Sequence, residues 1–408
     1  MPRALFIGLL LLAAISSPAG QFTGTLWVAP AYYDANPDAL FFIPGPFDEF
    51  KNYGSRQEFE AGYRQGGFNV LATAIHNLRE GTKPESDEIV NELYYDAQIA
   101  GQEISFGKKI MSWGVGYGFR PLDVVQREDR RRLFLRTLEG VKFVAGDYFT
   151  DDSAFTLAYI NPDRGQDDDR IDEESLALKY YRLQDNTDIH AVARLSGRSG
   201  IEAGVGFSHV VNEGLEGHGS ILYQNRYNKR INRLTESGSP LLATGNPIQE
   251  RSFRNGVKAL LGATWTHASG ISLLGEFWFD NAAYSGNEWD DLRQLTWSQL
   301  GLLGTGQDGA VYSNIGASTE FLSQSNLLQQ NLLLRISHDS QDAIDSALDL
   351  LYTPEDRGWT LTAALTHERD NQNFELGLRI FGGHPDSAYH AIPTSSTVYL
   401  TWQFAFGF

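Results

Sequence analysis

The sequence predicts an all-β protein, a transmembrane antiparallel up-and-down β-barrel of about 18 strands, with about 16 strands as the alternative. The first observation is alternation, because short segments with apolar and polar side chains in turn recur along nearly the whole chain. The second is that short and long connections between these segments also alternate. The third is the last segment, 397–408, which has one uniformly apolar face. We therefore expect a single barrel over residues 20–408, with outer loops that fold inward.

The first 19 residues are expected to form a signal peptide. Arg3 supplies a positive charge, and residues 4–15 form an apolar stretch that is too short to span a bilayer as a helix. Ser17 and Ala19 place small residues where a signal peptidase cleaves. We expect cleavage after Ala19, so the mature chain is exported.

Strands are located from the alternation of side chains along the sequence. The expected strands are 24–33, 56–65, 67–79, 88–100, 102–113, 139–149, 153–161, 174–184, 187–196, 200–211, 216–228, 255–268, 271–281, 327–339, 344–353, 359–369, 372–382 and 395–408.

The two faces separate well in the clearest strands. In 271–281, Leu273 and Phe277 are placed toward lipid, while Glu276 is placed toward the lumen. In 372–382, Leu376 and Leu378 are placed outward, with Arg379 inward. Charged residues avoid the lipid face because they are costly there.

The connections support the same topology. Short links follow the even strands, while most long links follow the odd strands, and the exception is a short link near Gly197. Outer-membrane barrels have short periplasmic turns and long outer loops, so both termini are expected in the periplasm. The long links are 34–55, 114–138, 162–173, 229–254, 282–326 and 383–394.

The final strand also resembles the C-terminal signal by which outer-membrane barrels are recognised for assembly. Its apolar face ends in a series of aromatic residues, namely Trp402, Phe404, Phe406 and Phe408. A soluble sheet with such an edge would aggregate, whereas a barrel pairs its last strand with its first.

Composition excludes several classes of protein. Asp and Glu outnumber Lys and Arg by 51 to 33, giving a net charge of −18, so nucleic acid is not an expected partner. There are no cysteines, which removes disulfides and thiolate metal sites. The mean hydropathy of −0.31 is compatible with a barrel, because only every second strand residue faces lipid.

The expected lumen carries charges of both signs. These either pair across neighbouring strands and hold the wall, or leave an unpaired subset that forms a selectivity surface. The expected basic residues are Arg64, Lys109, Lys142, Lys179, Arg194, Lys258, Arg335 and Arg379. The expected acidic residues are Glu58, Glu60, Glu92, Asp96, Glu202, Glu276, Asp280, Glu368 and Glu375.

The segment 104–123 runs from the fifth strand into a long outer loop. It combines glycines, aromatic rings on which a sugar can stack, and arginine, with Arg127 and Arg130–Arg132 following. Folded inward, it would form a constriction for an anionic or sugar-like solute. The alternative is an aromatic girdle followed by a solvated basic loop. The residues expected along the constriction and solute path are Lys109, Trp113, Tyr117, Phe119, Arg120, Arg194, Arg335 and Arg379.

The same segment resembles the alginate-export-type outer-membrane barrels and related porin-like proteins. The matching residues are Gly107, Lys108, Trp113, Gly114, Phe119, Pro121 and Asp123, while Lys109 replaces the usual Gln. The resemblance implies a monomeric 18-strand barrel with a transport role. The family's conduit is strongly electropositive, whereas this chain is acidic and its expected lumen is mixed in charge.

Two other loops have weaker signals. The carboxylates Asp167, Asp168, Asp169, Asp172 and Glu173 either bind a divalent cation or form a solvated acidic loop without the spacing of an EF-hand. The loop 282–326 contains a possible short helix, capped by Asn287, that either enters the barrel mouth or covers the rim.

These observations predict a porin or channel of the bacterial outer membrane that passes hydrophilic solutes, small or polymeric, anionic or carbohydrate. No catalysis, cofactor or metal is expected, because no nucleophile elbow occurs and the nine histidines are scattered. The expected partners are membrane lipid, lipopolysaccharide, the barrel-assembly machinery and the solute. The alternatives are a non-conducting barrel that sheathes a partner or acts at the surface and, less favoured, an outer-membrane hydrolase.

Overall fold

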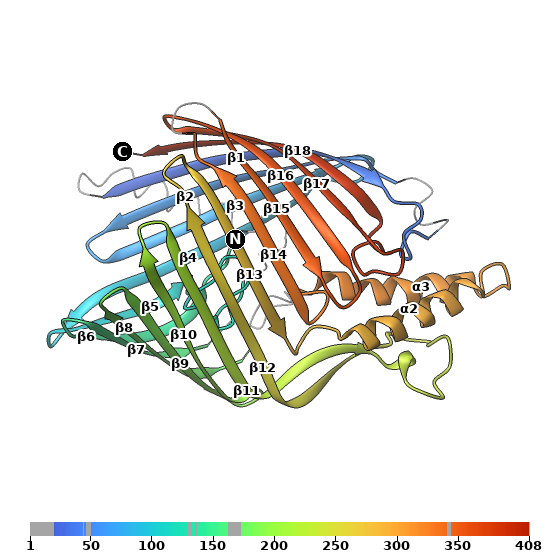
Figure 1. Cartoon of the computed structure of the whole chain (residues 1–408), viewed down its shortest axis with the longest axis horizontal. Coiled ribbons are helices and arrows are strands. Elements are labelled where there is room, and N and C mark those ends of the chain that lie inside the picture. Colours follow the sequence, from blue (N-terminus) through green and yellow to red (C-terminus); the bar gives the residue numbers. More distant parts are fainter. Residues whose placement is uncertain are drawn as a thin grey trace, which may run out of the picture.

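A computed structural model describes residues 20–43, 45, 50–128, 133–134, 137–161, 173–340 and 344–407. It contains one 18-stranded antiparallel sheet that closes on itself, because β1 pairs with both β2 and β18 (Figure 1). The predicted fold class is therefore confirmed. The expected signal peptide and Phe408 lie outside the described residues. Among the described residues, no helix is both long and apolar enough to cross a membrane.

The strands follow one another around the barrel in chain order. They are β1 (Gln21–Ala35), β2 (Tyr53–Gln65), β3 (Phe68–Arg79), β4 (Glu85–Ile99), β5 (Gln102–Lys109), β6 (Val141–Phe149), β7 (Ser153–Ile160), β8 (Ser175–Gln184), β9 (Thr187–Ser196), β10 (Gly200–Asn212), β11 (Leu215–Asn232), β12 (Ile248–Thr266), β13 (Ile271–Asp280), β14 (Gln330–His338), β15 (Asp345–Thr353), β16 (Gly358–Arg369), β17 (Gln372–Gly383) and β18 (Thr394–Gly407).

Strand β10 shows why this chain closes into a barrel with an apolar exterior. Ile201 and Val205 are exposed on the outer face, whereas Glu202 between them in sequence is completely buried on the inner face. Successive side chains of a strand point to opposite faces, so one pattern places apolar groups outside and ionisable groups inside. This arrangement is the reverse of that in a soluble protein, and it recurs in the other strands of the wall.

The closing seam joins the first and last strands. Trp27 pairs with Gln403 and Gly24 with Phe406 across β1 and β18. Gly24 leaves room for the Phe406 ring, because a Cβ atom on Gly24 would lie 2.2 Å from that ring. The seam thus depends on a small residue opposite a large one.

The long-loop end of the barrel carries its own small core, separate from the lumen. The loop 281–329 forms two helices, α2 (Gly286–Leu300) and α3 (Asp308–Ser318), followed by the short helix η2 (Thr319–Ser323). Trp289 and Leu292 of α2 pack against Phe41 and Tyr389 from two other outer loops. The helices extend beyond the ends of the strands, so they cover the rim (Figure 1).

Three details of this end differ from the sequence-based expectations. The N-cap of α2 is Ser285, which forms a capping box with Glu288, rather than Asn287. Besides the link at 197–199, the links at 80–84 and 354–357 on this side are also short. In contrast, β11 and β12 are longer than expected and rise past the rim, ending in the short helix η1 (Arg233–Thr235).

Candidate functional site: an inward loop and two chambers

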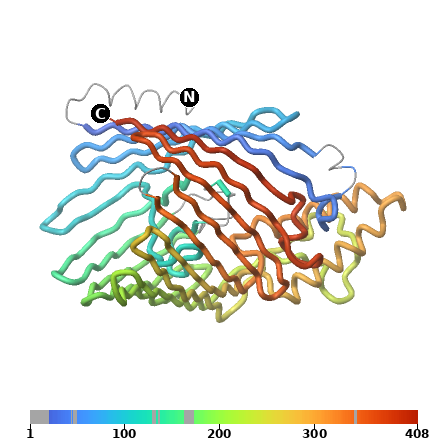
Figure 2. The backbone as a smooth tube through the Cα atoms, turned by 45° about the horizontal axis from the view of Figure 1, so that its top comes forward, coloured from blue at the N-terminus to red at the C-terminus, as the bar shows by residue number. Residues whose placement is uncertain are grey.

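The described part of the connection between β5 and β6, residues 110–128, 133–134 and 137–140, enters the barrel and is termed the pore loop (Figure 2). Its residues Met111, Trp113 and Leu122 belong to a buried apolar cluster with the inward side chains of the β6 to β9 wall. The loop covers this part of the wall, so the inward side chains here are apolar and shielded from the lumen. The wall residues of the cluster include Val141, Phe143, Ala158, Ile160, Ala177 and Val192.

A buried carboxylate, Asp123, holds the root of the pore loop. The Asp123 side chain accepts hydrogen bonds from the backbone N–H groups of Trp113, at 2.6 Å, and Gly114, at 2.7 Å. The Ser112 hydroxyl donates to the same carboxylate at 3.2 Å. Gly114 has no alternative here, because a Cβ atom would lie 2.7 Å from the Arg120 Cβ. The bonds of Asp123 fix the direction in which the loop leaves β5.

The tip of the pore loop is held by the opposite wall. Glu276 of β13 accepts hydrogen bonds from the backbone N–H groups of Tyr117, at 2.6 Å, and Gly118, at 2.7 Å. The Nε2 atom of His218 on β11 lies 2.8 Å from the same carboxylate. Glu276 is 1% exposed, so these bonds form away from bulk water. The loop therefore crosses the lumen and is clamped on its far side.

The returning arm of the loop is anchored on a third part of the wall. The Phe134 ring lies between Trp27 of β1 and Tyr399 of β18, with centroids 5.5 Å from each and edge-on geometry. The Thr137 hydroxyl donates to Glu58 of β2 at 2.6 Å. With root, tip and return all fixed, the loop acts as a partition rather than a free lid.

The partition separates two polar cavities. The outer chamber has a volume of about 320 Å³ and lies toward the long loops, while the inner chamber, of about 690 Å³, lies against β14 to β18, β1 and β2. Gly118, Ser325 and Asn326 line both, so the chambers meet at these residues, termed the neck. The outer chamber is lined among others by Arg120, Arg127, Arg194, Arg198, Gln224, Lys229, Lys258 and Asp280. The inner chamber is lined among others by Glu58, Glu60, Tyr117, Phe134, Arg335, Asp349, Glu375, Arg379 and Tyr399.

Aromatic stacking shapes the neck. Phe119 of the pore loop stacks on Trp278 of β13, with ring centroids 5.9 Å apart, and the Trp278 N–H donates to Asn326 at 2.9 Å. A Cβ atom on Gly118 would lie 2.9 Å from Leu333 and 3.0 Å from Trp278. The absence of a side chain at Gly118 therefore lets the loop pack directly against these wall side chains at the neck.

Cationic groups gather on the outer side of the neck. Lys258 pairs with Asp280 at 3.2 Å and lies 5.6 Å above the Phe119 ring. The Arg127 guanidinium lines the same chamber near both groups, and in the described part of the chain its side chain makes no hydrogen bond or ion pair. An uncommitted guanidinium beside a polar cavity is suited to bind a carboxylate or phosphate.

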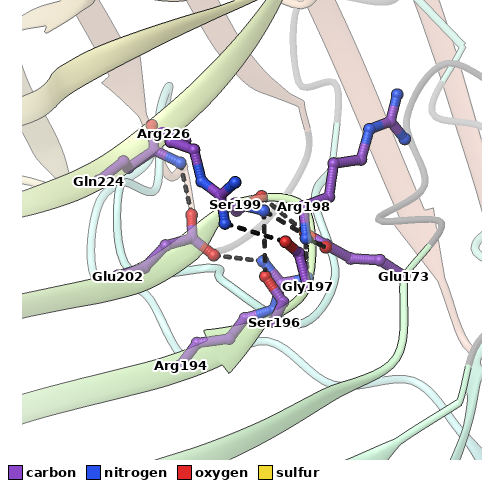
Figure 3. A network of polar contacts seen from close by, with 9 residues as sticks. All are labelled: Glu173, Arg194, Ser196, Gly197, Arg198, Ser199, Glu202, Gln224 and Arg226. Atoms are coloured by element: carbon purple, nitrogen blue, oxygen red, sulfur yellow. Dashed lines mark hydrogen bonds and ion pairs between the residues drawn. The ribbon is translucent and has the colours of Figure 1, made fainter.

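A second polar cluster, at the outer ends of β9 to β11, is structural (Figure 3). Arg194 is 1% exposed and pairs with Glu202 and with Glu173, the latter at 3.0 Å. Glu173 also accepts from the backbone N–H of Arg198, at 2.8 Å, and the Ser199 hydroxyl, at 2.6 Å. Burial raises the pKa of Glu173, but these hydrogen bonds and the charge of Arg194 lower it by more than burial raises it. The pKa of Glu173 is therefore below its ordinary value. The cluster fixes the short 197–199 turn.

The structure places the predicted site residues in three groups. Phe119 and Arg120 line the outer chamber, and Tyr117, Arg335 and Arg379 line the inner chamber. Arg335 is paired with Asp349, at 2.8 and 2.7 Å, and lies 5.2 Å from the Tyr117 ring. Arg120 donates to Gly116 and Ser112, at 3.0 and 2.8 Å, so it also shapes the loop itself.

Four other predicted residues have different surroundings. Trp113 is 7% exposed inside the apolar cluster, so its ring offers no stacking surface to a solute. Arg194 is committed to its buried ion pairs. The Lys109 ammonium lies 4.5 Å above the Tyr94 ring near the root of the loop. Lys142 is exposed and shares the outward face with Val144, so it does not face the lumen.

Several motif residues act through the backbone. Gly107 has a φ of +131°, and a Cβ atom there would lie 2.3 Å from the Leu93 carbonyl oxygen. Pro121 and Asp123 form the turn at which the chain reverses. Arg130–Arg132 and the acidic run at 167–172 lie outside the described residues, as does the cation site considered there.

Sequence reasoning missed the clamp and the neck. Glu276 was placed correctly in the lumen, but nothing near it in sequence indicates that it binds the pore-loop tip. Asn326 was expected only as part of a long outer loop, although it ends up between Trp278 and Asp280. The alternation of apolar and polar residues along β13 predicts that Glu276 points into the lumen. Its hydrogen-bond partners depend on how the pore loop folds, which the local pattern does not show.

Comparisons with known proteins define the fold. No protein-family model matches the sequence, and no curated protein is similar to it. Among solved structures, OccAB1 of Acinetobacter baumannii superposes with a TM-score of 0.58 at 7% identity, covering 97% of this chain and 99% of that one. OccK5 (OpdH) of Pseudomonas aeruginosa gives 0.56 at 9% identity, covering 96% and 98%. P. aeruginosa OpdK with vanillate gives 0.53 at 10% identity, covering 95% and 99%. The chain thus has the closed 18-strand architecture of these outer-membrane porins.

Proposed function

We propose that this protein is a channel of the bacterial outer membrane that passes small hydrophilic solutes, including anionic ones, by diffusion. The observation that carries the proposal is the clamped pore loop, which divides a polar lumen into two chambers that meet at a neck. An interior built only for stability would be filled, whereas this one retains cavities of about 320 and 690 Å³ lined by charged groups. The exterior apolar face suits insertion into lipid.

The chemistry of the outer chamber favours anions. Among the described residues the Arg127 guanidinium has no hydrogen bond or ion pair, and Lys258 lies nearby. Vanillate, the compound named with OpdK, is an aromatic carboxylate, and a carboxylate is the kind of group that these cations would bind. A carbohydrate is the second candidate solute class, because the inner chamber presents Tyr117 and Phe134 to stack on a sugar ring.

The remaining expectations about location and partners are part of the same proposal. An exported chain, cleaved after Ala19, would be inserted by the barrel-assembly machinery with both termini in the periplasm and its outer loops among lipopolysaccharide. Relationship to alginate-export-type barrels rests on the motif from Gly107 to Asp123. A sheath around a partner protein is disfavoured, because the pore loop occupies the space that such a partner would need. No catalytic role is proposed.

Single-channel recording of the refolded protein in a planar bilayer tests the proposal. We expect steady conductance with a reversal potential that shifts in a salt gradient. The variant Gly118→Val should lower conductance by about half or more, because its side chain does not fit against Leu333 and Trp278 and must push the loop tip into the neck, where the narrowest cross-section limits the current. Gly245→Val is the matched control, because a Cβ atom at Gly245 meets nothing within 4 Å.

Two outcomes would contradict the channel. The first is a folded barrel that never conducts, which would instead favour the non-conducting surface protein. The second is equal conductance of the Gly118→Val variant, the Gly245→Val variant and the unaltered protein, which would place the solute path elsewhere.

A further inference from the structure

His218 and Glu276 meet across the strand that separates them. His218 lies on β11 and Glu276 on β13, and both pair in register with Gly262 of β12. A Cβ atom on Gly262 would lie 2.7 Å from the Glu276 Cγ atom and still closer to the His218 Nε2 atom. The glycine therefore provides the space in which the Nε2 atom approaches the Glu276 carboxylate to 2.8 Å.

The imidazole ring of His218 lies between two carboxylates. Its Nε2 atom contacts Glu276, while its Nδ1 atom lies 3.8 Å from Glu216 on the same strand. An ionised carboxylate accepts hydrogen bonds and cannot donate one, so the Nε2 atom carries a proton whenever Glu276 is ionised. The Nδ1 atom can gain or lose a second proton. The ring can therefore change its charge while it keeps its bond to Glu276.

The other charged groups around this pair have partners of their own in the described part of the chain. On β10 the residue opposite His218 is Ser208, whose hydroxyl donates to Glu216. On β14 the residue opposite Glu276 is Leu333. Lys258 is paired with Asp280, Arg335 with Asp349, and Asp188 accepts a hydrogen bond from Tyr181. Further titratable or charged groups on the surrounding elements are His190 on β9, and Tyr117 and Arg120 on the pore loop.

A positive charge on His218 favours the clamped loop. With the loop tip in place, His218 is 5% exposed and Glu276 is 1% exposed, so water screens their attraction only weakly. Once the tip leaves, both side chains face the water of the lumen, where the same attraction is much smaller. Protonation of His218 thus stabilises the clamped loop more than the released loop, and the clamp should strengthen as pH falls.

The range of pH in which this effect operates follows from the residue types. Histidine is the side chain whose charge ordinarily changes between about pH 5 and pH 8. Glutamate ordinarily stays ionised over that range, so the carboxylate that accepts from the loop tip keeps its charge. A change of pH near neutrality therefore acts on the cation of the clamp and not on its anion.

We propose that His218 is a positioning residue that makes the clamp on the pore loop respond to pH, with the tip held tightly near pH 5.5 and loosely near pH 8. His218 acts through Glu276, which bonds to the loop. The inference rests on the proposed channel function for its consequence, which is a neck of steadier width in mild acid than in mild base.

Hydrogen exchange of the Tyr117 and Gly118 amides tests the clamp directly, because these two amides donate to Glu276. The detergent-solubilised protein is compared at about pH 5.5 and about pH 8, after correction for the intrinsic effect of pH. Protection should be about tenfold lower at the higher pH, since an opposite charge at such a distance changes the proton affinity of a group by about tenfold or more. His218→Gln can donate a hydrogen bond but does not titrate, so its protection should be the same at both pH values.

Two further variants and a second readout sharpen the test. His209→Gln is the matched control, because His209 is exposed on the outward face of β10, and it should keep the full response. Glu216→Gln removes the carboxylate beside the Nδ1 atom and should move the change in protection to lower pH. Open-channel current noise in a planar bilayer should rise with pH in the unaltered protein and stay constant in His218→Gln.

The outcomes separate this inference from the function on which it rests. Equal protection at the two pH values in the folded, unaltered protein would overturn the pH response, as would a response that persists in His218→Gln. If His218→Gln lacks the heat-modifiable folded band, Glu216→Gln decides, and an unshifted change in protection there would overturn the inference. A protein that shows the exchange response and never conducts would retain the clamp and overturn the channel function.

Discussion

At the scale of single residues, the pore loop depends on carboxylates that accept hydrogen bonds from backbone N–H groups. Asp123 holds the root and Glu276 holds the tip, and both acceptors are buried. A carboxylate is the right acceptor because it presents two oxygens to several donors and needs no donor of its own. The shape of the neck thus depends on a residue on β13 whose side chain is almost completely buried.

Glu276→Gln should loosen the tip of the pore loop. The glutamine has the same shape, but its NH₂ group would face one of the two N–H donors of Tyr117 and Gly118. Hydrogen bonds to a charged group contribute about 1.5 to 3 kcal/mol, so the unclamped fraction should rise about tenfold to a hundredfold. Open-channel current noise measures it. Glu368→Gln, on β16 with an exposed side chain, is the control. Identical noise in both variants would mean that the clamp does not hold the loop.

Arg194→Ala should destabilise the barrel far more than Arg198→Ala. Removing Arg194 leaves Glu202 buried without its cation, a change that costs about 3 to 5 kcal/mol in comparable sites. Arg198 pairs with Glu250 at an exposed position, where an ion pair contributes about 0 to 1 kcal/mol. Urea midpoints of the folded, detergent-solubilised variants compare the two. Equal midpoints would show that the cluster of Figure 3 is not a stabilising unit.

At the scale of elements, the strands could be predicted because their pattern is local. The alternation of Leu273, Glu276 and Phe277 is visible in the sequence and reappears as outward and inward faces. The arrangement of the pore loop is not local, because Tyr117 and Glu276 are 159 residues apart. The burial of Trp113 likewise depends on inward apolar residues from several strands. The glycines and aromatic residues of the loop predict a constriction, but the composition does not predict which aromatic ring faces the lumen.

The helix α2 should be sensitive to acid through its cap. Burial raises the pKa of Glu288, but bonds from Lys229 and the Ser285 backbone lower it more, so its pKa is below the ordinary value. A lowered carboxyl pKa stabilises the folded state above the unfolded pKa of about 4.3, and that stability is lost as pH falls through the folded pKa.

Backbone hydrogen exchange of α2, corrected for the intrinsic effect of pH, measures this sensitivity. Protection of α2 should fall between neutral pH and pH below about 4. Glu288→Gln should show weaker protection at neutral pH and little further change on acidification. A variant with the same acid profile as the unaltered protein would assign the transition to another group.

At the scale of the whole molecule, closure depends on the seam and not on the outer helices. Deleting residues 403–408 removes the pairs of Thr23 to Trp27 with β18 and of Gln372 and Asn373 with β18, which leaves the ends of β1 and β17 unpaired on one side. Replacing 286–318 with a short linker removes no strand pairing. We expect the first deletion to abolish the heat-modifiable folded band on gels and the second to retain it. Loss of the band in both would mean that the cluster around Trp289 is required for closure.

The long ribbon of β11 and β12 gives the barrel an asymmetric profile. Its strands have 18 and 19 residues, well beyond the roughly 10 that cross a bilayer, so its far end stands clear of the rim. Gly238 and Gly245, in the connection at that end, have nothing within 4 Å of a Cβ position. This connection is therefore a natural insertion point for an epitope tag. Antibody labelling of intact cells at such a tag, and no labelling of a tag on the mature N-terminus, would establish the sidedness of the barrel directly.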